Sequence, residues 1–498
     1  MVSTSKINRK LTVRKYINLK FTVLVCEEWC CKTKIAVLYL CHDESQTIEL
    51  RFGDLPGAND YVTTSARRNR IKKAKVMNEK FLHFIWKHQL FEKKQLLSSD
   101  LQTIQIVAPG TANNDSGPDF SNAKIRIGDT LWIGQVEIHI NGSDYLKHGH
   151  ERDAAYANVI LHVVYTDDLP PKRLPFPTLA LKGLIPLHYI RNYEALLVSR
   201  TWIPCANQLP VLEDFALEHL FARLAGNRLE RKTTFIAHAL LQNNSDWEET
   251  FYQLLGRSLG MKVNGDTFYE LTKRVPLKLL SRHRRSRLQL EALLLGTAGL
   301  LQSIVEDTYV IQLQREYQFL QHKYQLEPLT ATQWKFARMR PANFPTIKIA
   351  QLAAIIENQS QLFSKVCSAT SIQQLKQLFE AEVSDYWKQH YHCNKLSIKR
   401  EKHVSGSTQE LIIINTVIPV LFAYSLYVDE DKFRNKALYH LESTVAEDNK
   451  IIRQWESLGI KAKNAMQSQA LLELKHEYCD QLKCEQCMIG MRKIQMNN

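Results

Sequence analysis

The chain has 498 residues, of which 45% are hydrophobic and 23% are charged, an ordinary globular composition with room for two or more domains. The formal net charge is +14, but residues 1–76 hold 15 Lys and Arg against 7 Asp and Glu, which leaves a surplus of six elsewhere. Bulk charge is therefore weak evidence for an anionic partner. No secretory leader is visible, and no run approaches the ~20 apolar residues of a membrane span. We expect a cytoplasmic protein without a membrane partner, in which disulfides are not formed.

The opening segment differs from the rest of the chain. It holds four of the ten cysteines and ends in the basic run ARRNRIKKAKV, directly before Met77. From Met77 the text MNEKFLHFIWKHQLF places apolar residues at helical spacing. We expect Met77 to be the natural start and residues 1–76 to be an upstream extension. A basic arm that binds nucleic acid or a membrane surface is the alternative.

Residues 77–200 alternate between helix and strand patterns. A helix is predicted over 78–92 and strands over 102–107, 119–127 and 131–140, with a turn-rich loop before the second strand and a Gly128–Asp129 turn before the third. The polar segment SDYLKHGHERDAAYAN is expected to be helical in its second half. The β-branched run NVILHVVY predicts a strand buried on both faces, and a strand near 177–183 and a helix near 186–199 follow. This pattern indicates an α+β domain.

Charged residues lie on two of these strands. Residues i and i+2 of a strand share a face, so Glu137 and His139 point the same way. A tight hairpin through Gly128–Asp129 brings Asp119, which follows Pro118, back beside Glu137. Two converging carboxylates repel unless a cation lies between them, and Mg²⁺ or Mn²⁺ favours such oxygen ligands. The alternative is a turn or cap role for Asp119.

The order helix, three strands, helix, strand, with PD at 118–119 and E-x-H at 137–139, resembles the PD-(D/E)xK nuclease superfamily. The resemblance implies a restriction-endonuclease-like α/β core over 77–200 and a divalent-metal-dependent nuclease that acts on DNA or RNA. It assigns Asp119, Glu137 and the carbonyl of Ile138 as ligands of Mg²⁺ or Mn²⁺, and Glu79 as an additional acidic group. His139 replaces the family's lysine and, with a pKa near 6.5, would act as a base or a ligand. A catalytically inactive nucleic-acid-binding or scaffolding protein on the same fold is the alternative.

Ionisable side chains are dense after Glu137. Of these, His148, His150 and Asp153 could join Glu137 and His139 in a nitrogen-rich site for Zn²⁺, Mn²⁺ or Fe²⁺, which would make the protein a metallohydrolase of a small substrate. A buried structural histidine and helix-capping residues are the alternatives. The ionisable residues that follow Glu137 in this segment are Asp144, His148, His150, Asp153 and His162.

Residues 201–498 predict a large all-helical domain after the linker WIPCANQLP. Two basic clusters in it could contact nucleic-acid phosphates: Arg284 and Arg285 in SRHRRSR, and Arg338 and Arg340 in FARMRPANFP. Phenylalanines beside the second cluster could stack on unpaired bases. A solvated helix start and a proline-stabilised turn are the alternatives. The sequence identifies no protein partner.

Three cysteines near the C-terminus follow the spacing Cys479-x4-Cys484-x2-Cys487. In a reduced compartment this spacing suggests Zn²⁺ or an iron–sulfur cluster. Cys205 is the favoured fourth ligand because it lies at the domain junction, and Cys393 and His476 are alternatives. Several nucleases of the resembled superfamily carry such a C-terminal cluster. Small buried thiols that pack a core are the other interpretation.

Residues 77–498 also resemble an uncharacterised bacterial family, a domain of unknown function. The shared segments are GPDF, GQVEIH, HGH, RMRPANFP and the YC…C…C ending. This resemblance implies a relationship and carries no established activity.

Overall fold

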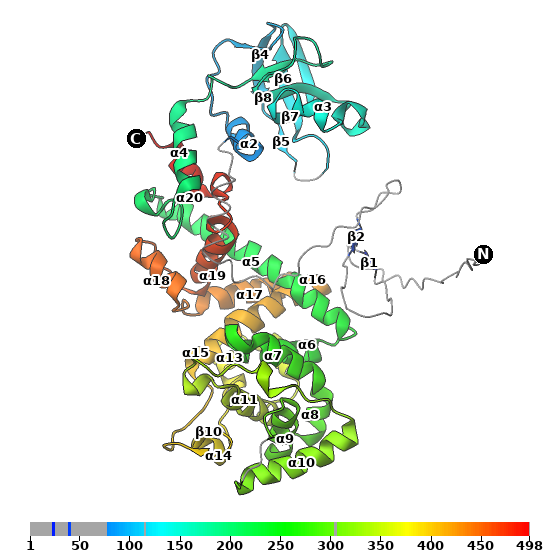
Figure 1. The fold of residues 1–498 in the computed structure, drawn as a ribbon, viewed down its shortest axis with the longest axis vertical. Coiled ribbons are helices and arrows are strands. Elements are labelled where there is room, and N and C mark those ends of the chain that lie inside the picture. Colours follow the sequence, from blue (N-terminus) through cyan, green and yellow to red (C-terminus); the bar gives the residue numbers. More distant parts are fainter. Residues whose placement is uncertain (1–21, 25–37, 41–76, 114–115, 303–305, 498) are drawn as a thin grey trace, which may run out of the picture. The chain divides into compact units, whose positions relative to one another are not determined.

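The computed structural model describes residues 22–24, 38–40, 77–113, 116–302 and 306–497 (Figure 1). The chain divides into two compact units, Met1–Ala74 and Lys75–Asn498. The described part of the first unit is an antiparallel pair, β1 (Thr22–Leu24) and β2 (Leu38–Leu40). The basic run before Met77 lies outside the described residues.

The second unit begins with α2 (Glu79–Lys87). Asn78 caps it, because its side chain accepts a hydrogen bond from the backbone N–H of Phe81. Apolar residues at helical spacing give α2 one strongly buried face, which packs against β7 of the sheet. Glu79 and His83 are one turn apart, so their side chains leave the helix on the same side. The buried residues are Phe81, Leu82, Phe84, Ile85 and Trp86.

A mixed sheet follows in the order β3-β4-β6-β7-β8-β9, with β5 paired to β6. The pairs from β3 to β7 are antiparallel, whereas β7–β8 and β8–β9 are parallel. β8 is buried over most of its length, as its continuous apolar run requires. The strands are β3 (Leu96–Leu97), β4 (Thr103–Ala108), β5 (Thr111–Ala112), β6 (Phe120–Ile127), β7 (Thr130–Asn141), β8 (Val159–Thr166) and β9 (Thr178–Ala180).

The crossover between the parallel strands β7 and β8 is made of short turns. It contains α3 (Asp144–Lys147) and the 3₁₀ turns η1 (His150–Arg152) and η2 (Ala154–Tyr156). The longer helix expected in the second half of this segment is absent from these described residues, because Gly149 adopts a left-handed conformation with φ 74° after α3. After β9, α4 (Leu187–Val198) closes this part of the chain.

The remainder is predominantly helical, so an α+β class with a large helical part is confirmed. A small antiparallel hairpin of β10 (His390–His392) and β11 (Lys395–Leu396) shows that "all-helical" was wrong in detail. The α-helices are α5 (Asp214–Gln242), α6 (Trp247–Leu259), α7 (Met261–Arg274), α8 (Leu277–His283), α9 (Arg287–Thr297), α10 (Thr308–Tyr324), α11 (Pro345–Asn358), α12 (Leu362–Ser368), α13 (Ile372–Leu378), α14 (Asp385–Lys388), α15 (Gly406–Ile412), α16 (Ile418–Val428), α17 (Asp431–Ser443), α18 (Lys450–Ser457), α19 (Ala465–Glu473) and α20 (Met488–Gln495).

Short 3₁₀ and π segments connect these helices. The π segment η6 continues α15 into α16, and η7 continues α19 toward the C-terminal cysteines. The segments are η3 (Ala206–Gln208), η4 (Ala331–Gln333), η5 (Pro341–Asn343), η6 (Ile413–Val417), η7 (Leu474–Cys479) and η8 (Cys484–Gln486).

One continuous helical stretch, Gly406–Val428, is long and apolar enough to cross a membrane by length and composition. The expectation that no run has this length is therefore wrong for this stretch. Its α16 portion packs against α5 and α17, and 67% of its most apolar window is buried inside the protein. Burial of this extent fits a core helix.

Candidate metal centre

Asp119 and Glu137 lie side by side where β6 begins. Phe120 pairs with Val136, so the residues before and after this pair meet across the two strands. The backbone N–H of Asp119 donates to Glu137 Oε2 at 3.1 Å, and the N–H of Ile138 donates to Asp119 Oδ2 at 2.9 Å. The structure thus brings together the two carboxylates that the motif placed on neighbouring strands.

Glu137 is buried, with 4% of its surface exposed. Burial raises the pKa of Glu137 to about 8, and the charges of Asp119 and Glu79 contribute to the rise. The hydrogen bond from the Asp119 N–H acts in the opposite direction. Without a cation, Glu137 therefore holds a proton at neutral pH. A bound cation would displace that proton.

Helix α2 brings a second acidic group and a histidine to the same place. His83 Nε2 lies 3.3 Å from Asp119 Oδ2. Burial raises the pKa of Glu79, while the nearby His148 lowers it and Asp119 raises it further. Sequence reasoning named Glu79 and missed His83. The signal was present, because positions i and i+4 of a helix share a face.

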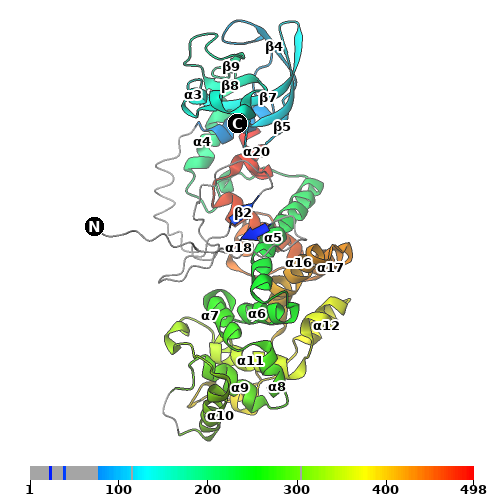
Figure 2. The ribbon, with the colours of Figure 1, turned by 90° about the vertical axis from the view of Figure 1, so that its right-hand side faces the viewer.

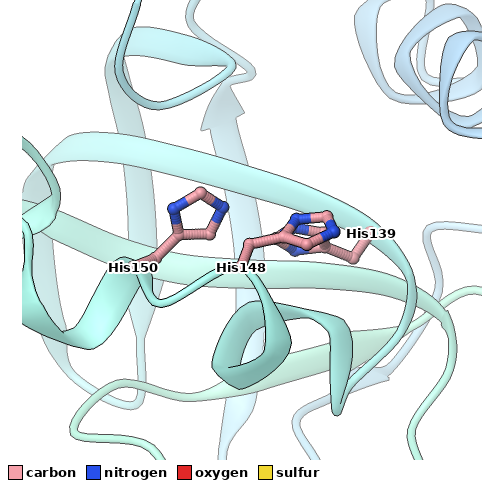
Figure 3. Close-up of side chains that lie close together, drawn as sticks. All are labelled: His139, His148 and His150. Atoms are coloured by element: carbon pink, nitrogen blue, oxygen red, sulfur yellow. The ribbon is translucent and has the colours of Figure 1, made fainter.

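His139, His148 and His150 gather beside this acidic pair (Figure 3). One ring nitrogen from each histidine lies within 4.8 Å of the others. Among the residues that the structure describes, these three histidines are the group of potential metal ligands that meets this distance limit. His139 Nε2 is 3.1 Å from His148 Nδ1 and 3.7 Å from Glu137 Oε1, and His150 Nε2 is 3.5 Å from the same carboxylate oxygen. The acidic and imidazole groups therefore form one continuous cluster.

His162 supports this cluster from β8. Its Nε2 lies 3.0 Å from His139 Nδ1, and both side chains are buried. Burial lowers the pKa of His139 to about 3, and neighbouring imidazoles add to the fall. Burial likewise lowers the pKa of His162 to about 4. Both rings are therefore neutral at pH 7, which is the form that binds a metal.

Aromatic rings line the cluster, and sequence reasoning did not select them. Tyr156 stacks on His150 with ring centroids 4.0 Å apart. Tyr145 meets His150 and His162 edge to face, with centroids 5.4 Å apart in both pairs. Burial raises the pKa of Tyr156 to about 12, so its hydroxyl keeps its proton.

Asp144 and Asp153 have local structural partners. Asp144 accepts hydrogen bonds from the backbone and side-chain nitrogens of Asn141 and pairs with Lys147 at 2.7 Å. Asp153 caps η2 by accepting from the N–H of Ala155. These contacts explain both residues as turn and cap residues.

We name the cluster of Glu79, His83, Asp119, Glu137, His139, His148 and His150 the carboxylate–histidine site.

The proposed nucleic-acid arginines lie in the helical part. Arg284 follows α8 and is partly buried, whereas Arg285, Arg338 and Arg340 are exposed. The neighbouring rings of Phe336 and Phe344 pack on each other at 5.4 Å and each contacts His392 at 4.8 Å. These contacts use part of the aromatic surface that base stacking would need.

Four of the described cysteines are buried and free. Cys205 precedes η3, Cys479 ends η7, Cys484 begins η8 and Cys487 follows it. Cys393 lies apart, in the β10–β11 turn, where its thiol faces the carbonyl of Leu300.

Fold and site together define an α+β protein with a mixed sheet, a large helical part and a carboxylate–histidine site with a buried base. The chain belongs to the family described as "Protein of unknown function (DUF2851)", whose model matches residues 79–450. The match contains the whole carboxylate–histidine site and ends before the C-terminal cysteines, so it does not cover the YC…C…C ending expected to be shared. No curated protein and no solved structure matches the chain.

Proposed function

We propose that this protein is a divalent-metal-dependent hydrolase that cleaves phosphodiester bonds in DNA or RNA. The carrying observation is the pairing of Asp119 with the buried Glu137 across β6 and β7. Carboxylates this close are stable together as anions only when a cation neutralises them. An Mg²⁺ or Mn²⁺ ion between them would do so with oxygen ligands.

The carbonyl of Ile138 is the proposed third ligand. Its backbone N–H donates to Asp119 Oδ2. The N–H and C=O of one strand residue face the same neighbouring strand, so this carbonyl lies on the Asp119 side of β7. Imidazole nitrogens stand 3.5 and 3.7 Å from Glu137, and a mixed oxygen and nitrogen environment favours Mn²⁺ over Mg²⁺.

A bound divalent ion supplies an acidified water and stabilises charge on the phosphate oxygens. His139 is neutral and, with so low a pKa, a weak base, so we assign it a lone pair toward the ion and not the fixed positive charge that a lysine provides. If His139 donates from Nδ1 to His162, its Nε2 lone pair faces Glu137 and the metal position.

A second candidate is a metallohydrolase that acts on a small phosphoester. The nitrogens of His139, His148 and His150 lie within 4.8 Å of one another, which suits Zn²⁺, Mn²⁺ or Fe²⁺. In this function the histidines are the principal ligands, and Asp119 has a supporting role.

Labelled single- and double-stranded DNA and RNA, and a chromogenic phosphodiester, test both functions with Mg²⁺, Mn²⁺ or Zn²⁺ added to metal-stripped protein. We expect Mn²⁺-dependent cleavage of nucleic acid. We also expect a loss of at least about 100-fold in Asp119→Asn and Glu137→Gln, because even outer partners of a metal contribute 10- to 100-fold.

Asp129→Asn is the matched control, because Asp129 is exposed in the turn of the same hairpin. It should cleave like the unmodified chain. Cleavage of the chromogenic ester alone, lost in His148→Ala, would support the second candidate. Nucleic-acid binding without cleavage under any metal would refute both hydrolase functions and favour a non-catalytic binding protein.

A further inference from the structure

Cysteines from two distant stretches of the chain meet at one buried place. Cys205 comes from the segment between α4 and α5, and the others come from the last turns before α20. Each is at most 8% exposed. Every pair among them is close enough for an electrostatic interaction between the thiols. We name Cys205, Cys479, Cys484 and Cys487 the four-cysteine site.

Contacts other than those of the cysteines hold the two stretches together. α20 packs against α4, as the two views show (Figures 1 and 2). The side-chain nitrogen of Asn192 on α4 donates to the carbonyls of Ile494 and Met496 at 3.1 and 2.8 Å. Lys493 on α20 donates to Gln208, next to Cys205. The site is therefore built by the fold on both sides.

Gly490 shows how closely the chain is folded around these thiols. A Cβ atom at Gly490 would meet the carbonyl oxygen of Cys484 at 2.2 Å. Only glycine permits this approach of α20 to η8. The backbone N–H groups of Ile489 and Gly490, in the first turn of α20, donate to the Cys487 sulfur. Helix N-termini stabilise thiolates in this way.

Cations also face the site. Lys475 interacts with Cys479, Lys493 with Cys205 and Arg223 with Cys487. Both lysines are at most 8% exposed; Lys475 also pairs with Asp480, and Lys493 donates to Gln208.

The spacing of the sulfurs distinguishes between metals. Zn²⁺ in a tetrahedral site has Zn–S bonds of about 2.3 Å, which places neighbouring sulfurs about 3.8 Å apart. Within the described residues no three of these thiols lie within 4.8 Å of one another, since the three histidines are the group that does. In an iron–sulfur cluster the four thiolates are divided among two or four iron atoms, so no single ion draws three of them together. We infer that Cys205, Cys479, Cys484 and Cys487 bind an iron–sulfur cluster.

The inferred cluster is independent of the proposed function and has a structural consequence. η8 contacts α2, the helix that carries Glu79 and His83. Phe81 of α2 stacks on Tyr193 of α4 with centroids 4.3 Å apart, and Asn78 donates to the Tyr193 hydroxyl at 3.1 Å. The cluster would therefore fix the packing of α2 and α4 on the C-terminal segment.

Metal analysis of the full chain, purified without oxygen from cells supplied with iron and zinc, tests the inference. We expect equal amounts of iron and acid-labile sulfide, about two or four of each per chain. A broad visible absorbance should bleach on reduction with dithionite. Stoichiometric zinc without sulfide, or no bound metal at all, would overturn the inference whatever the outcome of the cleavage assays.

Substitutions then assign the ligands. Cys205→Ala and Cys484→Ala should each lose most of the iron and sulfide. Cys393→Ala is the matched control, because this thiol is partly buried in the β10–β11 turn, and it should retain both. The soluble fraction of each variant is analysed by circular dichroism. Full iron in folded Cys205→Ala would remove Cys205 from the site and overturn the four-ligand assignment.

Discussion

The carboxylate–histidine site, of which Glu137 and His139 are buried, and the fully buried four-cysteine site are both clusters of ionisable groups, but the chain assembles them differently. The first takes its groups from α2 and one β-hairpin with the crossover that follows. The second joins Cys205 to residues 479–487 through helix packing. A local hairpin can be deduced from strand periodicity, whereas a distant partner depends on how helices pack.

The two sites also differ in the protonation of their ionisable groups when no metal is bound. Glu137 is buried and close to the charge of Asp119, so its deprotonation in the empty site is costly. The thiols stay protonated and neutral at pH 7, because burial raises the pKa of Cys205 and Cys484. The carboxylate–histidine site should therefore destabilise the metal-free protein as pH rises, and the four-cysteine site should not.

Glu137→Gln provides the largest test of this difference. Between the unfolded pKa of 4.5 and the folded value of about 8, the folded protein holds the Glu137 proton that the unfolded chain has lost. The free energy of unfolding therefore falls as pH rises through this window, and Glu137→Gln removes the fall. At pH 8 we expect the metal-free variant to be more stable than the unmodified chain by roughly 2 kcal/mol, because a pKa shift of one unit corresponds to about 1.4 kcal/mol and water entry moderates buried shifts.

Urea unfolding with a chelator from pH 5 to pH 8 measures this difference. The two proteins should converge near pH 5. Cys205→Ala is the comparison, and its stability offset should stay constant over the same range because the thiol pKa lies above it. An offset for Glu137→Gln that does not change with pH would contradict the sign worked out above.

His162→Phe tests the support behind the metal ligands. The substitution fills a similar volume but removes the hydrogen bond to His139 Nδ1. We expect Mn²⁺ affinity to fall by about 10- to 100-fold, the usual effect of losing an outer partner of a metal-binding histidine. Iron in the four-cysteine site should not change.

Isothermal titration with Mn²⁺ provides the measurement, and His188→Phe on α4 provides the control, because His188 has no contact with the carboxylate–histidine site among the described interactions. Equal Mn²⁺ affinity in His162→Phe and the unmodified chain would show that His139 needs no orienting partner.

The sequence predicted the framework of the carboxylate–histidine site better than its surroundings. The Gly128–Asp129 turn predicts that Asp119 returns to this part of β7, but a regular hairpin would pair it with Ile138. The register shift between Phe120 and Ala123, which strand alternation does not predict, places Asp119 beside Glu137. Asp144 and Asp153 were proposed because acidic residues bind metals, but short acidic side chains also cap turns, and spacing alone does not separate the two roles. The apolar spacing that predicts α2 does not mark His83, although His83 lies one turn after Glu79 on the same side of the helix.

For the four-cysteine site, the sequence identified the local group of thiols but not their distant partner. The close spacing of Cys479, Cys484 and Cys487 was evident in the sequence, but the fourth thiol was one of several alternatives. No local pattern connects Cys205 to the C-terminus. The connection depends on Asn192 and Gly490, whose roles appear only when α4 and α20 are packed together.

Arg338 and Arg340 test the smallest effect, on a surface separate from the residues of both sites. Both are exposed; Arg338 has a left-handed backbone with φ 62°, and Arg340 directly precedes η5. If they contact phosphates, Arg338→Gln and Arg340→Gln should each weaken nucleic-acid binding only severalfold. Each should also lower by about one the salt slope, which is the slope of log affinity against log salt concentration.

Phe336→Ala, by contrast, should lower stability and leave the salt slope unchanged, since Phe336 packs on Phe344 and His392. Fluorescence anisotropy with labelled single-stranded DNA at several salt concentrations measures the slope. An unchanged slope in a variant that carries both Arg338→Gln and Arg340→Gln would show that any nucleic-acid binding uses another surface. The loss of two phosphate contacts must reduce counterion release.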